Sequence, residues 1–252
     1  MKIVKNKVLP LLFAICSYAS ISNGQEEQIA EKIQVKPKIS ANKVAFGDKS
    51  LIMDEKGHWS INAGGKRILR DSYYIKIAGV KNGIGVDDNS VVYDKKFNYN
   101  KDEKKFTYSC KFPTGENGVG VFTRTVKLVA DDLLQVDIKS AIPETVKVSY
   151  QHITFMFPFT VCADKTIIVN GKPKQFSKAD APNTAKAQKV FSGKVKSILF
   201  TPEKISTSFK MKLSTKNYCS IKENRNGRRA AMVVIRISPD KNGEISYLLN
   251  LK

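Results

Sequence analysis

The side chains that could do chemistry in this chain are a tyrosine, a histidine and an arginine in its central third. Tyr150 and His152 alternate on one face of the run 145–159, which they share with Met156. Arg124 alternates onto an otherwise apolar face of the run 119–130. A tyrosine or histidine base beside a cation that neutralises a carboxylate is the arrangement that β-elimination from an acidic sugar polymer requires. On a shallow surface, the same residue types would bind an anionic ligand without reacting.

Two of the candidate residues have more than one interpretation. A guanidinium among apolar side chains is costly unless it is paired, so Arg124 binds an anionic ligand, pairs with an internal aspartate, or reaches solvent at the strand end. Trp59, the only tryptophan, offers a ring on which a sugar can stack, or it packs in the core with Ile61. We take Arg124, Tyr150, His152 and Trp59 as the candidate ligand-binding residues.

No established catalytic motif accompanies these residues. The chain has only two histidines, His58 and His152, and it lacks G-x-S-x-G, H-E-x-x-H and a glycine-rich phosphate loop. Most of the acidic residues fall in turns, where aspartate is favoured for local bonding to the backbone. The sequence therefore identifies no catalytic residue, predicts no metal site and no cofactor, and leaves open whether the protein is an enzyme, although it favours a protein without catalytic activity.

Of the four cysteines, Cys16 lies in the N-terminal segment that we expect to be removed on export. The other three, Cys110, Cys162 and Cys219, lie in apolar or aromatic strand contexts with no metal-ligand spacing. An odd number allows at most one disulfide within the chain. The pairing stays open, and buried thiols that pack as small apolar groups are the interpretation that the contexts favour.

The first two dozen residues have the layout of a secretory signal peptide. Lys2, Lys5 and Lys7 precede the apolar run 8–19, and small residues offer a cleavage point before Gln25. The apolar run is too short for a membrane span, which needs about 20 residues. We expect residues 1–24 to be removed on export to the periplasm or the medium. A flexible lead over 25–38 would follow, with no transmembrane segment after cleavage.

The chain is strongly basic, with 43 Lys and Arg against 23 Asp and Glu and a formal net charge of +20. Removal of residues 1–24 would leave +17, because that segment holds three lysines and no acid. Such a surface attracts polyanions, although lysines spread this evenly also fit a solvated coat. Outside the cell such polyanions include acidic polysaccharides, lipid headgroups, cell-wall polymers and stray nucleic acid, and among these we expect acidic polysaccharide rather than a specific nucleic acid as the partner.

Short alternating runs of Val, Ile, Phe, Tyr and Thr, punctuated by Gly, Asn, Asp and Pro, predict antiparallel strands. The candidate strands are 43–47, 50–54, 58–62, 67–80, 90–99, 104–112, 119–130, 133–140, 145–159, 165–170, 195–200, 205–213, 217–223, 229–238 and 244–251. They predict an all-β fold, a large antiparallel two-sheet β-sandwich in one domain over 39–252. Ile153, Phe155, Phe157 and Phe159 share a face at period two, which predicts the packing face of that strand.

The C-terminal half carries a recognisable order of elements. The strand and turn Ile167-Ile168-Val169-Asn170-Gly171-Lys172 are followed by a variable loop, by Arg228-Arg229-Ala230, and by two closing strands over 232–238 and 245–251. Over roughly residues 120–252 this order resembles the β-supersandwich domains of the galactose-mutarotase-like superfamily. The resemblance implies carbohydrate as the ligand class. Mutarotases of that superfamily use a histidine pair and a carboxylate, whereas the two histidines here are far apart, so no catalytic residue is carried over.

Taken together, these patterns lead to an expected function. We expect an exported, noncatalytic β-sandwich protein that binds carbohydrate or a surface polymer. One alternative is a polysaccharide lyase that acts on an acidic glycan, which needs Arg124, His152 and a tyrosine to meet in one cleft. Another is a structural or assembly protein of the cell envelope.

Overall fold

The computed structural model of the protein describes residues 42–80, 83–86, 91–115, 118–184, 186–201, 209–225, 232–240 and 242–250. The chain divides into two units, Met1–Ile39 and Ser40–Lys252, and all of the described residues lie in the second. The predicted signal peptide and the lead over 25–38 lie outside them. No helix of the described part is long and apolar enough to cross a membrane.

The described part of the chain is built from antiparallel strands and one short 3-10 turn, η1 (Phe159–Val161), which confirms the predicted all-β fold. In chain order the strands are β1 (Asn42–Phe46), β2 (Lys49–Met53), β3 (Trp59–Ala63), β4 (Lys66–Ile77), β5 (Ile84–Gly85), β6 (Tyr93–Asn100), β7 (Lys105–Pro113), β8 (Val119–Ala130), β9 (Leu133–Ala141), β10 (Val148–Pro158), β11 (Thr166–Val169), β12 (Lys172–Gln175), β13 (Gln188–Phe200), β14 (Phe209–Asn224), β15 (Met232–Ile237) and β16 (Glu244–Asn250).

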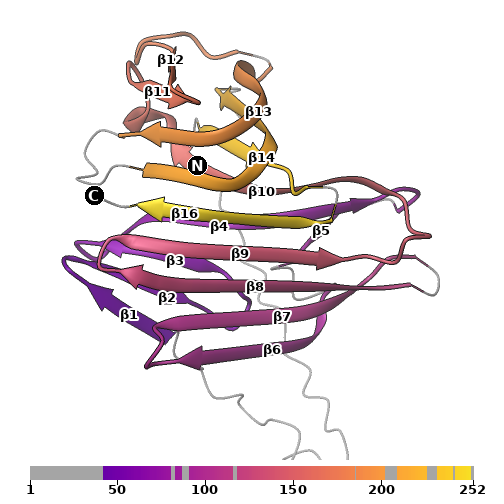
Figure 1. The fold of residues 1–252 in the computed structure, drawn as a ribbon. Helices are drawn as coiled ribbons and strands as arrows, with labels where there is room; N and C mark the ends of the chain where they lie inside the picture. The colour runs from indigo at the N-terminus through magenta and orange to yellow at the C-terminus, as the bar shows by residue number, and fades with distance from the viewer. Residues whose placement is uncertain are drawn as a thin grey trace, which may run out of the picture. The chain divides into compact units, whose positions relative to one another are not determined.

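The strands form two layers that are joined through β14 (Figure 1). One layer, here called the β10 sheet, runs β1-β2-β3-β4-β10-β15 and ends on the second half of β14. The other, the β9 sheet, starts from the first half of β14 and runs β16-β9-β8-β7-β6. Hydrogen bonding is therefore continuous from one layer to the other, and β13 pairs along both halves of β14.

Aromatic side chains from the two layers meet in the core. Phe155 of β10 makes edge contacts with Phe209 and Tyr247, with ring centroids 5.5 and 5.9 Å apart. The ring of Tyr73 on β4 lies 4.8 Å from that of Phe122 on β8. The predicted packing face is confirmed: Ile153, Phe155, Phe157 and Phe159 are all buried. Phe159 lies in η1 rather than in the strand, because β10 ends at Pro158.

Local turn chemistry accounts for the connection between β11 and β12. Asn170 and Gly171 both have positive φ, which is the geometry of a two-residue type I′ hairpin, and Val169 pairs with Lys172 on either side of it. The two predicted strands 205–213 and 217–223 are one strand in the structure, β14, which runs from Phe209 to Asn224. Its first half pairs with β16 and its second half with β15, while β13 pairs along both halves.

The three cysteines after residue 100 are free and buried, as the apolar contexts predict. Burial raises the pKa of Cys162 and of Cys219 to about 12, with the carboxylate of Glu223 also raising that of Cys162. These thiols therefore act as packing groups rather than as nucleophiles.

Candidate functional site

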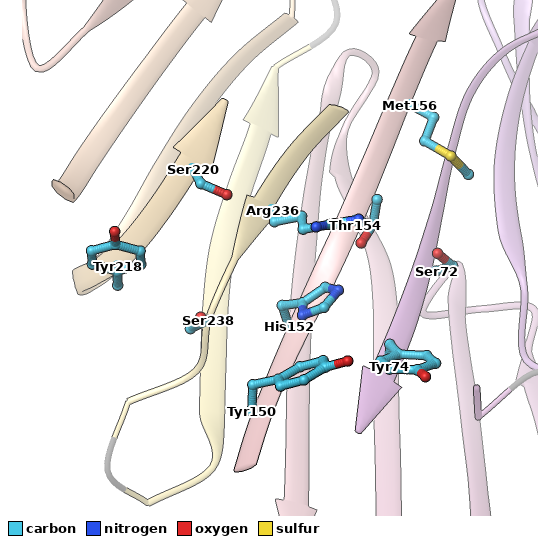
Figure 2. Close-up of a pocket in the computed structure, with 10 residues that line it drawn as sticks. All are labelled: Ser72, Tyr74, Tyr150, His152, Thr154, Met156, Tyr218, Ser220, Arg236 and Ser238. Carbon is cyan, nitrogen blue, oxygen red and sulfur yellow. The ribbon is translucent and has the colours of Figure 1, made fainter. Parts of the chain in front are cut away.

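The outward face of the β10 sheet carries an open hollow of about 600 Å³ (Figure 2). Four strands that lie side by side supply its lining: β4, β10, β15 and the second half of β14. The lining residues are Ser72, Tyr74, Tyr150, His152, Thr154, Met156, Tyr218, Ser220, Arg236 and Ser238. Because side chains alternate along a strand, these residues face outward while their neighbours face the core.

A row of short polar side chains crosses this face from strand to strand. Ser72 pairs with Thr154, Thr154 pairs with Arg236, and Arg236 pairs with Ser220. Directly opposed residues of paired strands project on the same side of a sheet, so Arg236 lies between the hydroxyls of Thr154 and Ser220, and Ser72 lies one strand beyond Thr154. Figure 2 shows Arg236 extending from β15 toward β10.

A cluster of three flat rings borders this row. His152 lies opposite Tyr74 on β4, with ring centroids 5.8 Å apart. Tyr150 stacks on His152 at 5.7 Å with the rings 14° apart, and on Tyr74 at 5.9 Å. Tyr150 is 49% exposed, so the cluster presents an accessible ring surface. Gly83 packs directly against Tyr74: a Cβ at position 83 would lie 1.9 Å from the tyrosine hydroxyl, so only glycine allows this approach.

The lining of the hollow carries a positive charge and no negative charge. Arg236 is exposed, and none of the lining residues is acidic. Desolvation, together with the charge of Arg236, lowers the pKa of His152 from 6.5 to about 4. His152 is therefore a neutral imidazole at physiological pH. Among the described residues no cluster of His, Cys, Asp and Glu could hold a metal ion.

The depressed pKa of His152 makes a prediction about stability. The folded protein binds this proton more weakly than the unfolded chain, so stability is complete above about pH 6.5 and falls as the pH drops toward about 4. Between about pH 7.5 and about pH 5 the loss from this group should be about 2 kcal/mol. Denaturant unfolding of the wild type and of His152→Gln at both pH values measures it. The same pH dependence in both proteins would contradict the assignment.

The structure brings together two of the four predicted ligand-binding residues. Tyr150 and His152 both line the hollow. Trp59 has no exposed surface, so its ring cannot stack on a ligand, and it packs in the core with Ile61 as its alternative interpretation has it. Arg124 is 1% exposed and lies inside the protein, so it cannot act as an accessible anion-binding residue.

The internal partner of Arg124 is Asp71 on β4. Its Nη2 lies 3.3 Å from the Asp71 carboxylate, and both side chains are almost entirely buried. Its Nη1 donates to the backbone carbonyl of Gly57, and the guanidinium lies 5.3 Å from the centroid of the Phe122 ring. Arg124 thus connects β8 to β4 and to the turn before β3, and it serves the core rather than a site.

Sequence reasoning missed Arg236, Tyr74 and Tyr218. A signal for Arg236 was present, because it is the single charge in the apolar run Met232–Ile237. Tyr74 and Tyr218 alternate with buried residues on their strands. What the sequence does not contain is the strand order that places β4, β10, β15 and β14 side by side.

Comparison with known proteins gives a likeness of fold. No protein-family model matches the chain, and no curated protein matches its sequence. The structure is similar to α-N-acetylgalactosaminidase NagBb from Bifidobacterium bifidum in complex with GalNAc, with a TM-score of 0.56 and 7% identity. The ligand-free form of that enzyme gives a TM-score of 0.50 and 8% identity. Both alignments cover 84% of this chain and 36% of the enzyme, so the chain spans about a third of the length of these structures.

A looser likeness is to a heparan sulfate lyase HepC mutant from Pedobacter heparinus, at a TM-score of 0.37 and 8% identity over 81% of this chain and 33% of that one. This likeness is too distant to bear on the architecture. The matches to NagBb agree with the all-β sandwich described above, and at this identity the similarity is one of fold.

Proposed function

We propose that this protein is an exported carbohydrate-binding protein and that the hollow on the β10 sheet is its binding site. The observation that carries the proposal is the stacked ring cluster of Tyr74, Tyr150 and His152 beside the exposed Arg236. The C–H face of a sugar ring packs against the electron-rich face of an aromatic ring. Serine and threonine hydroxyls in the adjoining row are suited to hydrogen bonds with sugar hydroxyls.

Binding fits the lining of the hollow better than glycoside hydrolysis does. Most glycosidases hold two carboxylates on either side of the bond that they cleave, and no acidic residue lines this hollow. A guanidinium and a neutral imidazole instead suit a sugar that carries a carboxylate or sulfate group. The likeness of fold to a galactosaminidase supports carbohydrate as the ligand class. The predicted signal peptide supports a place outside the cytoplasm.

A second candidate is a lyase that cleaves an acidic glycan by β-elimination. One observation favours it: a neutral histidine, three tyrosines and an arginine line the same hollow. In that reaction a base removes the proton next to the carboxylate, the arginine stabilises the resulting negative charge, and the glycosidic oxygen leaves. A lyase forms an unsaturated sugar, so incubation with an acidic glycan should raise the ultraviolet absorbance, whereas a binding protein leaves the absorbance unchanged.

Binding isotherms with a uronate-containing polysaccharide and with a neutral one test the binding site. Arg236→Ala should weaken binding of the acidic glycan by about tenfold to a hundredfold, because a hydrogen bond to a charged group is lost. Tyr150→Ala should weaken binding of both glycans by about threefold to tenfold, because a stacking surface is lost.

Lys210→Ala is the matched control, since this lysine is exposed on the first half of β14 and lies outside the hollow. It should bind like the wild type at a salt concentration that screens dispersed charges over about 8 Å. If Arg236→Ala and Lys210→Ala had the same effect under that condition, the attraction would belong to the basic surface as a whole, and the proposal would be wrong.

A further inference from the structure

A second hollow, of about 530 Å³, lies on β11, β12 and β13 and has a different character from the first. Four lysines line it and no acidic residue does: Lys172, Lys174, Lys189 and Lys194. All four are exposed. Asn170, at the turn between β11 and β12, fixes one wall, because its side chain accepts from the backbone N–H of Lys196 and donates to the carbonyl of Lys194.

The two hollows are neighbours on one continuous face. Ser192 of β13 pairs with Ser220, and Lys194 pairs with Tyr218, so the polar row of the first hollow continues onto β13. The hydroxyls of Ser192 and Tyr218 are hydrogen-bonded at 2.5 Å. Tyr218 lines the first hollow and Ser192 lines the second, so this bond lies where the two meet.

The face that results crosses five neighbouring strands, β4, β10, β15, β14 and β13. At a strand spacing of about 4.8 Å it is about 19 Å wide, which suits several linked sugars rather than one. Its character changes along that width, from stacked rings at Tyr74, Tyr150 and His152, through Arg236 and the hydroxyls, to the lysines.

We propose that one anionic polysaccharide chain binds across both hollows, with sugar rings on the aromatic cluster and carboxylate or sulfate groups on the lysines. This inference rests on the proposed function and extends it to the length and charge of the ligand. Hydroxyls along the row favour a glycan, because sugar hydroxyls can both donate to them and accept from them, whereas a polyanion without hydroxyls can only accept.

The test uses titration calorimetry with polygalacturonate oligomers of two lengths, a disaccharide and an octasaccharide. The octasaccharide should bind the wild type more tightly than the disaccharide does. Lys189→Ser combined with Lys194→Ser should weaken octasaccharide binding by about tenfold, which is the sum of two exposed charge contacts. The same variant should leave disaccharide binding unchanged, whereas Tyr150→Ala should weaken both.

The outcomes are distinguishable. If both oligomers bind equally and the lysine variant has no effect, the second hollow takes no part, and the proposed function stands while this inference falls. If neither oligomer binds, both fall. If inorganic polyphosphate displaces the octasaccharide at equal charge concentration, the face selects charge alone, and the glycan assignment is wrong.

Discussion

Asp71→Ala should lower the free energy of unfolding by about 3–5 kcal/mol, the typical cost of removing one partner from a buried ion pair. The Asp71 and Arg124 side chains are 0% and 1% exposed. Without the carboxylate, the guanidinium keeps its contacts with the Gly57 carbonyl and the Phe122 ring, but its charge is left uncompensated in the core. Chemical denaturation followed by circular dichroism gives the difference directly.

The double variant Asp71→Leu with Arg124→Met separates charge from packing. If the cost of the single variant comes from an unpaired charge, the double variant should recover most of the lost stability, because an apolar pair of similar volume replaces a buried ion pair at little cost. The matching single variants are Asp71→Leu and Arg124→Met. If the stability loss of the double variant equalled the sum of their two losses, this account would be contradicted and the effect would be assigned to lost packing.

Phe155→Ala should cost about 3–5 kcal/mol, as expected for a large-to-small change in a core that cannot collapse around the cavity. The ring is fully buried between the layers, with edge contacts to Phe209 on β14 and Tyr247 on β16. Both sheets would lose contacts, so the effect should appear as a shift of a single unfolding transition.

Met156→Ala is the matched control for Phe155→Ala, because Met156 is the next residue on the same strand and is 48% exposed. Its cost should stay within about 0.5 kcal/mol, as for surface changes in general. A loss below about 1 kcal/mol at Phe155, or a larger loss at Met156, would mean that the strand faces the other way.

Much of the fold could be predicted from the sequence because its information is local. The alternation in β10 distinguishes Phe155 and Phe157 from Tyr150 and Met156 without knowledge of any other strand, and the Asn170-Gly171 pair marks its hairpin. The continuity of β14 could not be predicted, since it depends on two different partner strands. Arg124 shows the same limit: the sequence indicates that the arginine needs an anion, but only the tertiary structure identifies that anion as Asp71.

The candidate site was predictable only in part for the same reason. Tyr150 and His152 were found because they lie on one strand and share one face. Arg236 was missed because its role depends on the pairing of Thr154 with a strand near the end of the chain. A periodic pattern shows which way a side chain points and carries no information about its neighbour across the sheet.

The pairing of β15 between β10 and β14 has a consequence for how this protein forms. The row from Ser72 through Thr154 to Arg236 joins segments from the early, middle and late parts of the chain. No short stretch could assemble the face by itself, and the loops that close it are long, which is typical of slowly folding β proteins. During synthesis the aromatic cluster of β4 and β10 can form before the arginine has been made. The chain would acquire its charge complementarity to an anionic ligand only as the last strands join the sheet.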